Sequence, residues 1–150
     1  MFPRFKCVYF VLIILRCLLF LVLYLLVAAE ANTTDLNEMY GYILSPNFPE
    51  GYPSDSDITW NISVPLGFRI KLYFMHFDLE PSYLCEYDFV KSGAEQPLLF
   101  CGKERTDTEQ TPGQQTIYSH GNTMSLTFQS DFSNEERFTG FKVHYAAEGE

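Results

Sequence analysis

Basic residues are scarce in this chain, and their scarcity limits the partners it can bind. Lys and Arg number 10 against 19 Asp and Glu, which gives a net charge of −9 at pH 7. Such a balance opposes binding to nucleic acid and to anionic membrane surfaces. It often means no more than a solvated acidic surface, but it also suits cations and lysine-rich partners.

Cysteine is scarce as well, with 4 in the whole chain. Cys7 and Cys17 lie in an apolar N-terminal run, so Cys85 and Cys101 are the pair left for a folded domain. In an oxidising compartment this pair predicts one disulfide, which would contribute about 3 kcal/mol in the chain-entropy model. A zinc site is disfavoured because neither cysteine has a close Cys or His companion.

The sequence lacks the usual signatures of catalysis. No serine sits in a Gly-x-Ser-x-Gly turn, and the three histidines (His76, His120 and His144) do not suggest a catalytic set. Glu80 and Asp88 can be considered as a general acid and base pair, but nothing in the sequence indicates a sugar cleft. The residues therefore favour binding over catalysis.

The N-terminus is typical of a secretory leader. Two basic residues precede an apolar run, Val8–Ala29, that only Arg16 interrupts, and Ala29-Glu30-Ala31 fits a cleavage site. This pattern predicts a signal peptide over residues 1–31. An uncleaved signal anchor stays open, because about 20 apolar residues can span a bilayer. Arg16 would weaken such a span by about 2–3 kcal/mol.

Beyond the leader, apolar and polar residues alternate with a period of two, and turn residues separate the alternating segments. No helical period and no internal repeat is visible. We expect an all-β fold, a sandwich of two antiparallel sheets, with residues 147–150 as a linker stub. The expected strands are Tyr40–Leu44, Ile58–Val64, Phe68–Met75, Tyr87–Lys91, Leu98–Cys101, Gln115–Tyr118, Thr123–Ser130 and Phe138–Tyr145.

Two glycosylation sequons follow the leader, Asn32-Thr33-Thr34 and Asn61-Ile62-Ser63. Asn61 lies at an outward position of its alternating strand and is the better candidate. We expect a glycoprotein carrying glycans at Asn61 and Asn32.

Oxygen ligands for a hard cation are spread over separate predicted loops. The polar segment Asp131–Glu135 follows one strand, and Glu80 and Asp88 lie upstream. Three carboxylates and the Asn134 amide are the donors that calcium prefers. Carboxylates that converge repel one another unless a cation offsets them. The pattern predicts an extracellular calcium site.

Several strings carry a family resemblance. Gly41–Pro49, Tyr52-Pro53 and Trp60–Ile62 resemble the opening of a CUB domain. Three further strings are similar to the first CUB domain of the mannan-binding-lectin-associated serine proteases, of types one and three: Phe68–Phe77, Ser82–Asp88 and Ser130–Phe141. The resemblance implies a CUB-type jelly-roll β-sandwich over residues 32–146.

The chain departs from the family pattern at two positions. Ile58 stands where most CUB domains have a cysteine of a first disulfide, a loss that the complement-protease CUB domains share. Phe48 stands where the family often has tyrosine, which removes a hydroxyl that could support the calcium loops. The resemblance therefore implies a lower calcium affinity here.

The resemblance also implies a set of site residues. Calcium would be held by the side chains of Glu80, Asp88, Asp131 and Asn134 and by the Ser133 carbonyl. The oriented acids would then grip a lysine from the collagen-like stalk of mannan-binding lectin or a ficolin. The implied partner-binding residues are Glu80, Asp131 and Ser133 at the lysine, with Tyr87, Glu109 and Phe132 flanking them.

The resulting expectation is a secreted, non-catalytic, calcium-dependent binding module of the complement lectin pathway of innate immunity. The alternative is an N-terminal fragment of a complement-type serine protease, whose EGF-like, second CUB, sushi and trypsin-like domains this chain would lack. Family dimers pair the first CUB domain with the EGF-like module, so homodimerisation stays open. An uncleaved leader would instead make a membrane-anchored adhesion ectodomain.

Overall fold

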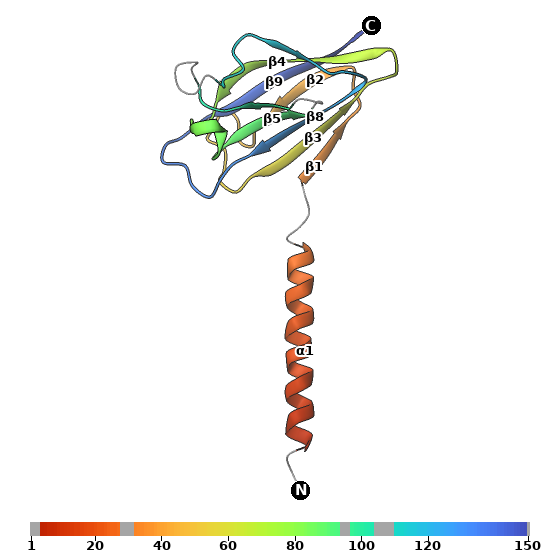
Figure 1. Ribbon diagram of the computed structural model, residues 1–150, viewed down its shortest axis with the longest axis vertical. Helices are drawn as coiled ribbons and strands as arrows, with labels where there is room; N and C mark the ends of the chain where they lie inside the picture. Colours follow the sequence, from red (N-terminus) through yellow and green to blue (C-terminus); the bar gives the residue numbers. More distant parts are fainter. Residues whose placement is uncertain (1–3, 28–31, 94–96, 104–109, 150) are drawn as a thin grey trace. The chain divides into compact units, whose positions relative to one another are not determined.

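The computed structural model describes residues 4–27, 32–93, 97–103 and 110–149. The chain divides into two units, Met1–Ala31 and Asn32–Glu150. The first holds one helix, α1 (Arg4–Val27), whose side chains from residue 8 to residue 22 are exposed (Figure 1). In the described part of the chain, no helix combines the length and hydropathy needed to cross a bilayer.

The second unit is a sandwich of two sheets, which confirms the predicted fold class (Figure 1). One sheet has the strand order β1-β3-β8-β5-β6, and the other has the order β2-β9-β4-β7. The strands are β1 (Asn32–Leu36), β2 (Tyr40–Leu44), β3 (Asp57–Ser63), β4 (Phe68–Asp78), β5 (Phe89–Gly93), β6 (Leu98–Phe100), β7 (Thr116–Tyr118), β8 (Thr123–Gln129) and β9 (Gly140–Gly149). A short 3-10 turn, η1 (Tyr83–Cys85), precedes β5.

Strand β1 was not predicted, and it makes the one parallel pair among the described strands, with β3. Parallel neighbours need a crossover between them. Here the chain leaves β1, joins the other sheet as β2 and returns as β3. Only Leu36 of β1 packs against the core, so the strand carries no alternating signal in its sequence.

The two sheets bury the apolar positions of the alternating strands between them. β8 buries Met124, Leu126 and Phe128, as its sequence pattern predicts. The facing sheet contributes residues of β4 and β9, and the rings of Phe128 and Phe141 meet with centroids 5.4 Å apart. This aromatic core fixes the ends of the strands, and therefore the loops that connect them.

Two strand boundaries differ from the prediction in ways that matter. β9 starts at Gly140 and continues to Gly149, through the segment expected to be a linker stub, because the first residues of β4 pair with residues 147–149. β5 starts at Phe89, so Tyr87 and Asp88 lie in the loop before it. Both side chains therefore lie at the end of the sandwich where β5 begins.

Candidate metal site

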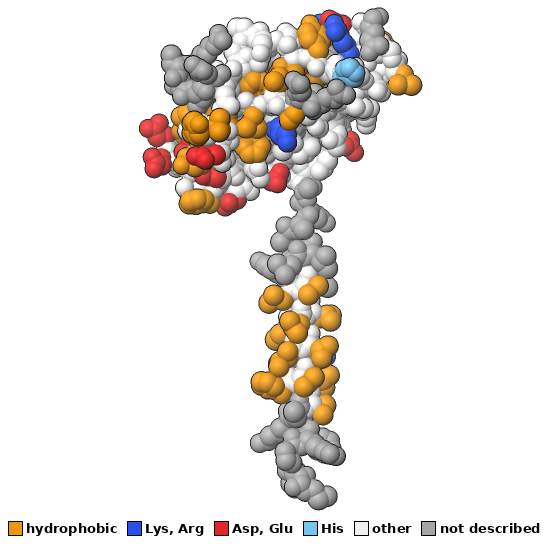
Figure 2. Space-filling view, viewed as in Figure 1, with side chains coloured by type: hydrophobic (Ala, Val, Ile, Leu, Met, Phe, Trp, Pro, Cys, Tyr) orange, Lys and Arg blue, Asp and Glu red, His pale blue; other side chains and the backbone are white. Residues whose placement is uncertain are grey.

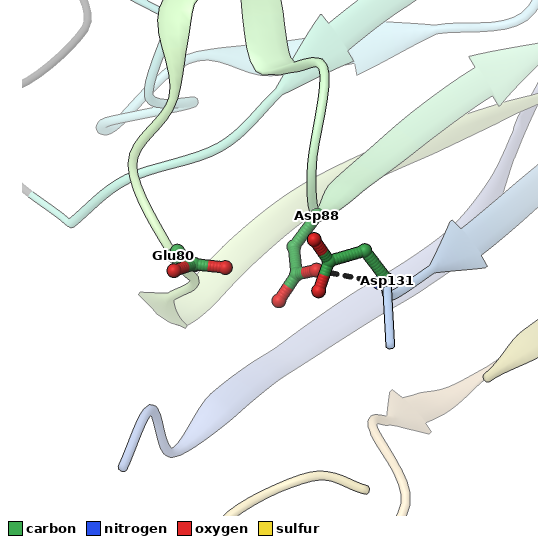
Figure 3. A group of neighbouring side chains, drawn as sticks. All are labelled: Glu80, Asp88 and Asp131. Carbon is green, nitrogen blue, oxygen red and sulfur yellow. Dashed lines mark hydrogen bonds between the residues drawn. The ribbon is translucent and has the colours of Figure 1, made fainter. Parts of the chain in front are cut away.

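Three acidic side chains meet at one end of the sandwich, each from a different loop. Glu80 follows β4, Asp88 precedes β5 and Asp131 follows β8. One potential ligand atom from each lies within 4.8 Å of the other two, as Figure 3 illustrates. Among the described residues this is the one group of three or more His, Cys, Asp and Glu that can hold a metal ion. Residues that are far apart in the sequence thus form one oxygen-rich cluster.

Asp88 connects the three loops. Its side chain is fully buried, and both carboxylate oxygens accept hydrogen bonds. The Tyr52 hydroxyl donates to Oδ2 at 2.6 Å, and the Asp131 backbone N–H donates to Oδ1 at 2.8 Å. The Tyr52 oxygen in turn accepts the Glu80 backbone N–H at 3.1 Å. One carboxylate and one hydroxyl therefore set the positions of all three acids.

Tyr52 was not among the predicted site residues. A tyrosine that packs its ring on a core phenylalanine, here Phe128 at 5.2 Å, has the sequence signature of an ordinary core residue. The signal that could have identified it is its place in the Tyr52-Pro53 string of the family pattern. Phe48 packs its ring on His76 at 5.2 Å, and the lower calcium affinity that the resemblance implies for this position stays a prediction. The hydroxyl that supports these loops comes from Tyr52.

The cluster is electrostatically unfavourable by itself. Burial raises the pKa of the Glu80 carboxyl above its ordinary value, and the charges of Asp88, Asp131 and Glu135 raise it further. Burial also raises the pKa of Asp88, although its hydrogen bonds from Tyr52 and the Asp131 N–H oppose the rise. Carboxyls whose charged forms are disfavoured in this way gain most from a nearby cation.

Two oxygen atoms beside the cluster are buried without a hydrogen-bond partner, Glu80 Oε2 and Asn134 Oδ1. A buried polar atom left unpaired costs about 1–3 kcal/mol. Both atoms belong to the predicted ligand set, and both are of the hard-oxygen type that calcium prefers. Carboxylates with raised pKa and orphaned oxygens together fit a divalent cation.

The loop that carries Asp131 and Asn134 is braced at both ends. The Asp131 backbone oxygen accepts the Asp55 N–H at 2.7 Å, and its side chain accepts the Ser133 N–H at 3.0 Å. Gly140 closes the other end with φ of +92°, where a Cβ atom would lie 1.9 Å from Ser45 Oγ. The backbone is therefore held in place while the acidic side chains face the cluster.

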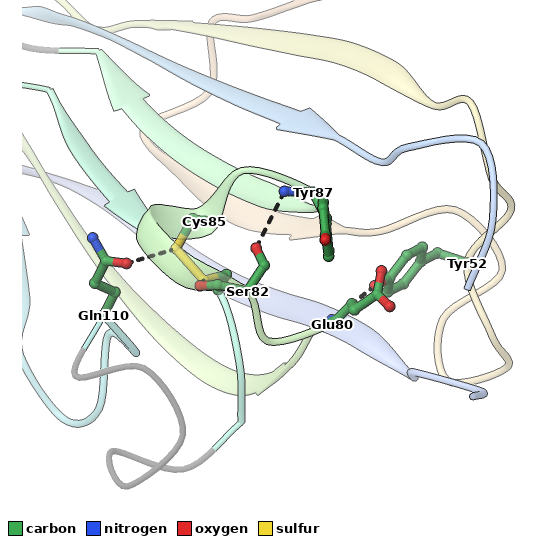
Figure 4. Close-up of a disulfide and its surroundings, with 7 residues drawn as sticks. Tyr52, Glu80, Ser82, Cys85, Tyr87 and Gln110 are labelled. Atoms are coloured by element: carbon green, nitrogen blue, oxygen red, sulfur yellow. Dashed lines mark hydrogen bonds between the residues drawn. A yellow bond between two sulfur atoms is a disulfide. The ribbon is translucent and has the colours of Figure 1, made fainter. Parts of the chain in front are cut away.

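A disulfide holds the loop between Glu80 and Asp88. Cys85 and Cys101 are bonded with a Cα–Cα distance of 5.5 Å, which confirms the predicted pair. In Figure 4 the Ser82 hydroxyl reaches across this loop and accepts the Tyr87 backbone N–H at 3.1 Å. These bonds fix the path of the chain from one acidic residue to the next.

The predicted partner-contact residues divide into described and undescribed ones. Phe132 is 78% exposed and Tyr87 is 49% exposed. Figure 2 shows acidic and hydrophobic side chains side by side at the end of the sandwich that carries η1 and the loop after β8. Glu109 lies outside the described residues.

The other predicted features are not part of the acidic cluster. Asn61 is exposed on β3, and its amide donates to Asp35 on β1 at 3.0 Å. Asn32 begins β1 and is also exposed. His144 lies between the rings of Tyr42 and Tyr73 on the four-stranded sheet. His76 contacts Thr139. The glycosylation sites stay predictions.

Comparison with known proteins gives a consistent family signal. The CUB domain family model matches residues 32–145. The human mannan-binding lectin serine protease 1 is 66% identical over 121 residues, which cover 79% of this chain and 17% of that protein. The CUB1-EGF-CUB2 domains of rat MASP-1 align with a TM-score of 0.73 at 65% identity, covering 78% of this chain and 43% of that one.

A more distant structure bears on the metal. The MASP-1 CUB2 domain bound to Ca²⁺ aligns with a TM-score of 0.64 at 27% identity, and the alignment covers 75% of this chain and 96% of that one. That domain of another protein thus has this fold and binds calcium. This chain spans about a sixth of the length of the curated relatives that it matches.

Proposed function

The chain belongs to the CUB domain family and is closely similar to the CUB1 region of the MASP-1 proteases, and from this premise we propose that it is a secreted, non-catalytic module that binds other proteins when loaded with calcium. The partner that we propose is the collagen-like stalk of mannan-binding lectin or a ficolin, in the complement lectin pathway. The similarity to mannan-binding lectin serine protease 1 supports the lectin connection.

One observation carries the proposal: carboxylates from three loops converge where buried oxygens of Glu80 and Asn134 have no partner. The side chains of Glu80, Asp88, Asp131 and Asn134 and the Ser133 carbonyl would hold the ion. When bound, calcium supplies the positive charge that offsets the three carboxylates. Extracellular sites of this type bind at about 10⁻⁴–10⁻³ M.

The three acidic residues would differ in whether they contact the cation alone or both the cation and a partner lysine. Asp88 is fully buried, so it can face only the ion and the loops that it connects. Glu80 and Asp131 are partly exposed and can accept from an ammonium group while they face the ion. A lysine ammonium is a compact charge with three donors, which suits such a pair of acids. Phe132 and Tyr87, with Glu109, would flank it.

Surface plasmon resonance with immobilised lectin stalks tests this proposal. Binding should need calcium, and it should fail for stalks whose lysines are acetylated, because acetylation removes the charge. Phe132→Ala should keep the calcium-dependent melting shift and weaken stalk binding at least about tenfold, or ~1.4 kcal/mol. Equal binding in calcium and in chelator would reject the proposal.

A second candidate function has its own support. The chain matches 17% of the length of the human protease, and that match is to its CUB1 region, so the module can also be the N-terminal part of a protease. Sequencing the transcript beyond Glu150 separates the two, because an EGF-like cysteine pattern would favour the protease.

N-terminal sequencing of the secreted protein tests cleavage of the leader, for which we expect a start near Asn32.

A further inference from the structure

The turn η1 exposes two large hydrophobic side chains next to the acidic cluster. Tyr83 is 78% exposed and Leu84 is 61% exposed. A single exposed hydrophobic residue needs no explanation. Here the two are adjacent in the chain and lie three and four residues after Glu80, in the turn η1, which Figure 1 shows at the same end of the sandwich as the loop after β8. Apolar side chains gathered around a charged cluster are typical of a protein contact surface.

The backbone of this turn holds Leu84 outward. Leu84 has φ of 52° and ψ of 24°, and Cys85 has φ of 53°, both in the left-handed region that residues with a Cβ atom rarely adopt. Cys85 is buried and bonded to Cys101. The Cys85 N–H donates to the Ser82 oxygen and the Glu86 N–H donates to the Tyr83 oxygen, each at 3.2 Å. The disulfide thus draws Cys85 inward while its neighbour stays in solvent.

A fixed turn of this kind is well suited to binding. A turn whose backbone is already fixed by hydrogen bonds and a disulfide loses little conformational freedom when a partner arrives. Tyrosine adds a large, rigid ring that can lie against an apolar partner group. Core packing does not account for the two side chains, since neither contributes to the buried core.

We propose that Tyr83 and Leu84 form an apolar contact surface that packs against the imino acids flanking the bound lysine of a collagen-like stalk. This inference rests on the proposed function, because the acidic cluster calls for a lysine at its centre. Proline-rich segments in extended helical form dock on aromatic-lined surfaces. Collagen-like chains carry Gly-X-Y repeats rich in proline and hydroxyproline, so such rings surround any lysine in them.

The distance from Glu80 to Tyr83 is similar to the distance from a lysine to a nearby imino acid in a collagen-like chain. A polyproline-type chain rises about 3.1 Å per residue, so a residue two or three positions from the lysine lies roughly 6–9 Å away. Tyr83 lies three residues from Glu80, and three residues of extended chain span at most about 10 Å. A lysine at Glu80 thus brings a neighbouring imino acid within reach of Tyr83 and Leu84.

Two variants separate this contact from the calcium site. Leu84→Gly removes the side chain at a left-handed position, where glycine is favoured, so the fold should be kept. Tyr83→Ala removes the exposed ring. The matched control is Leu66→Ala, a residue that is 86% exposed in the turn before β4, at the opposite end of that strand from Glu80. All three should keep the calcium-dependent melting shift of the parent protein.

The probe is a triple-helical peptide of Gly-Pro-Hyp repeats with one lysine, measured by surface plasmon resonance in calcium. Leu66→Ala should bind like the parent, and Leu84→Gly and Tyr83→Ala should each bind at least about fivefold more weakly. A second peptide has alanine in place of proline in the triplets beside the lysine. The parent should bind it more weakly than the first, whereas Leu84→Gly should hardly distinguish the two.

The outcomes separate the two proposals. If the parent binds the lysine peptide in calcium and both η1 variants bind equally well, the contact at η1 is overturned and the proposed function stands. If the parent does not bind the peptide or the lectin stalks in calcium, the proposed function is overturned and the η1 contact with it.

Discussion

The two ends of the sandwich differ in how their polar groups are satisfied. At the end with the turns before β4 and β8, the groups pair with one another: the Val64 N–H donates to the Asn122 oxygen, and the Asn122 amide donates back to the Val64 oxygen, both at 2.9 Å. At the other end, Glu80 Oε2 and Asn134 Oδ1 are buried without partners among three carboxylates. The polar groups of these turns are paired within the chain, and we propose that the unpaired oxygens at the other end bind a cation.

We propose that this difference separates the parts of the chain that serve stability from those that serve binding. We call the end with the turns before β4 and β8 the closed end, and the end with the acidic cluster the open end. At the closed end the Ser119 hydroxyl accepts the Ile70 N–H at 2.7 Å and donates to the Gly121 oxygen at 2.5 Å. A buried polar group without a partner lowers the stability of a fold, so each one needs an explanation, and beside three carboxylates a bound cation would supply it. The variants below compare the two ends directly.

The largest expected effect follows from removing Asp88. Asp88→Ala leaves the Tyr52 hydroxyl and the Asp131 N–H without their acceptor and removes one calcium ligand. Since hydrogen bonds to charged groups contribute about 1.5–3 kcal/mol each, we expect a loss of about 3 kcal/mol or more in calcium. Urea unfolding with and without calcium measures it.

Asn122→Ala at the closed end is the matched control for this variant. It loses one neutral side-chain hydrogen bond, so it should cost about 1 kcal/mol and keep the full calcium effect. A calcium effect that survives in Asp88→Ala, or disappears in Asn122→Ala, would contradict the contrast between the two ends.

Tyr52→Phe should have an intermediate effect. It keeps the ring against Phe128 but removes the hydroxyl that donates to Asp88 and accepts from Glu80. We expect a loss of about 1.5–3 kcal/mol and a weaker calcium affinity, measured by calorimetric titration. Tyr73→Phe, on the exposed face of β4, should change stability by less than about 0.5 kcal/mol. Equal affinities in the two variants would remove Tyr52 from the site.

The smallest expected effect concerns pH. The pKa values of Glu80 and Asp88 are raised in the calcium-free fold, first by burial. These groups therefore stabilise the calcium-free fold below their ordinary pKa of about 4, and that contribution is lost as pH rises through the raised values. Calcium binds the deprotonated forms, so its stabilising effect should grow over the same range. A calcium-dependent melting shift that is the same at pH 4 and pH 7 would contradict this sign.

Much of the fold follows from local sequence pattern, whereas the connections at the site do not. The alternation of Met124, Leu126 and Phe128 predicts both a strand and its buried face. β1 escapes prediction because four of its five residues are exposed and its place depends on a parallel pairing with β3. Whether such a segment forms a strand depends on its tertiary contacts, because its sequence has no alternating apolar positions that would indicate a buried face.

The acidic residues were predicted as a set, but the means of holding them were not. Oxygen chemistry and the family resemblance single out Glu80, Asp88 and Asp131. The role of Tyr52 depends on a hydrogen bond between residues 36 positions apart, which no local pattern reveals. The left-handed turn at Leu84 depends likewise on the disulfide that buries Cys85.

The central claim is that the open end of the sandwich is completed by calcium, and thermal unfolding tests it most directly. The measurement compares the parent protein and Asp131→Ala, each in calcium at about ten times the dissociation constant and in chelator. The linkage gain at that concentration is roughly 1.4 kcal/mol, so the parent should melt about 5 °C higher in calcium, and Asp131→Ala should not respond. The same melting temperature for the parent protein in calcium and in chelator would contradict the claim.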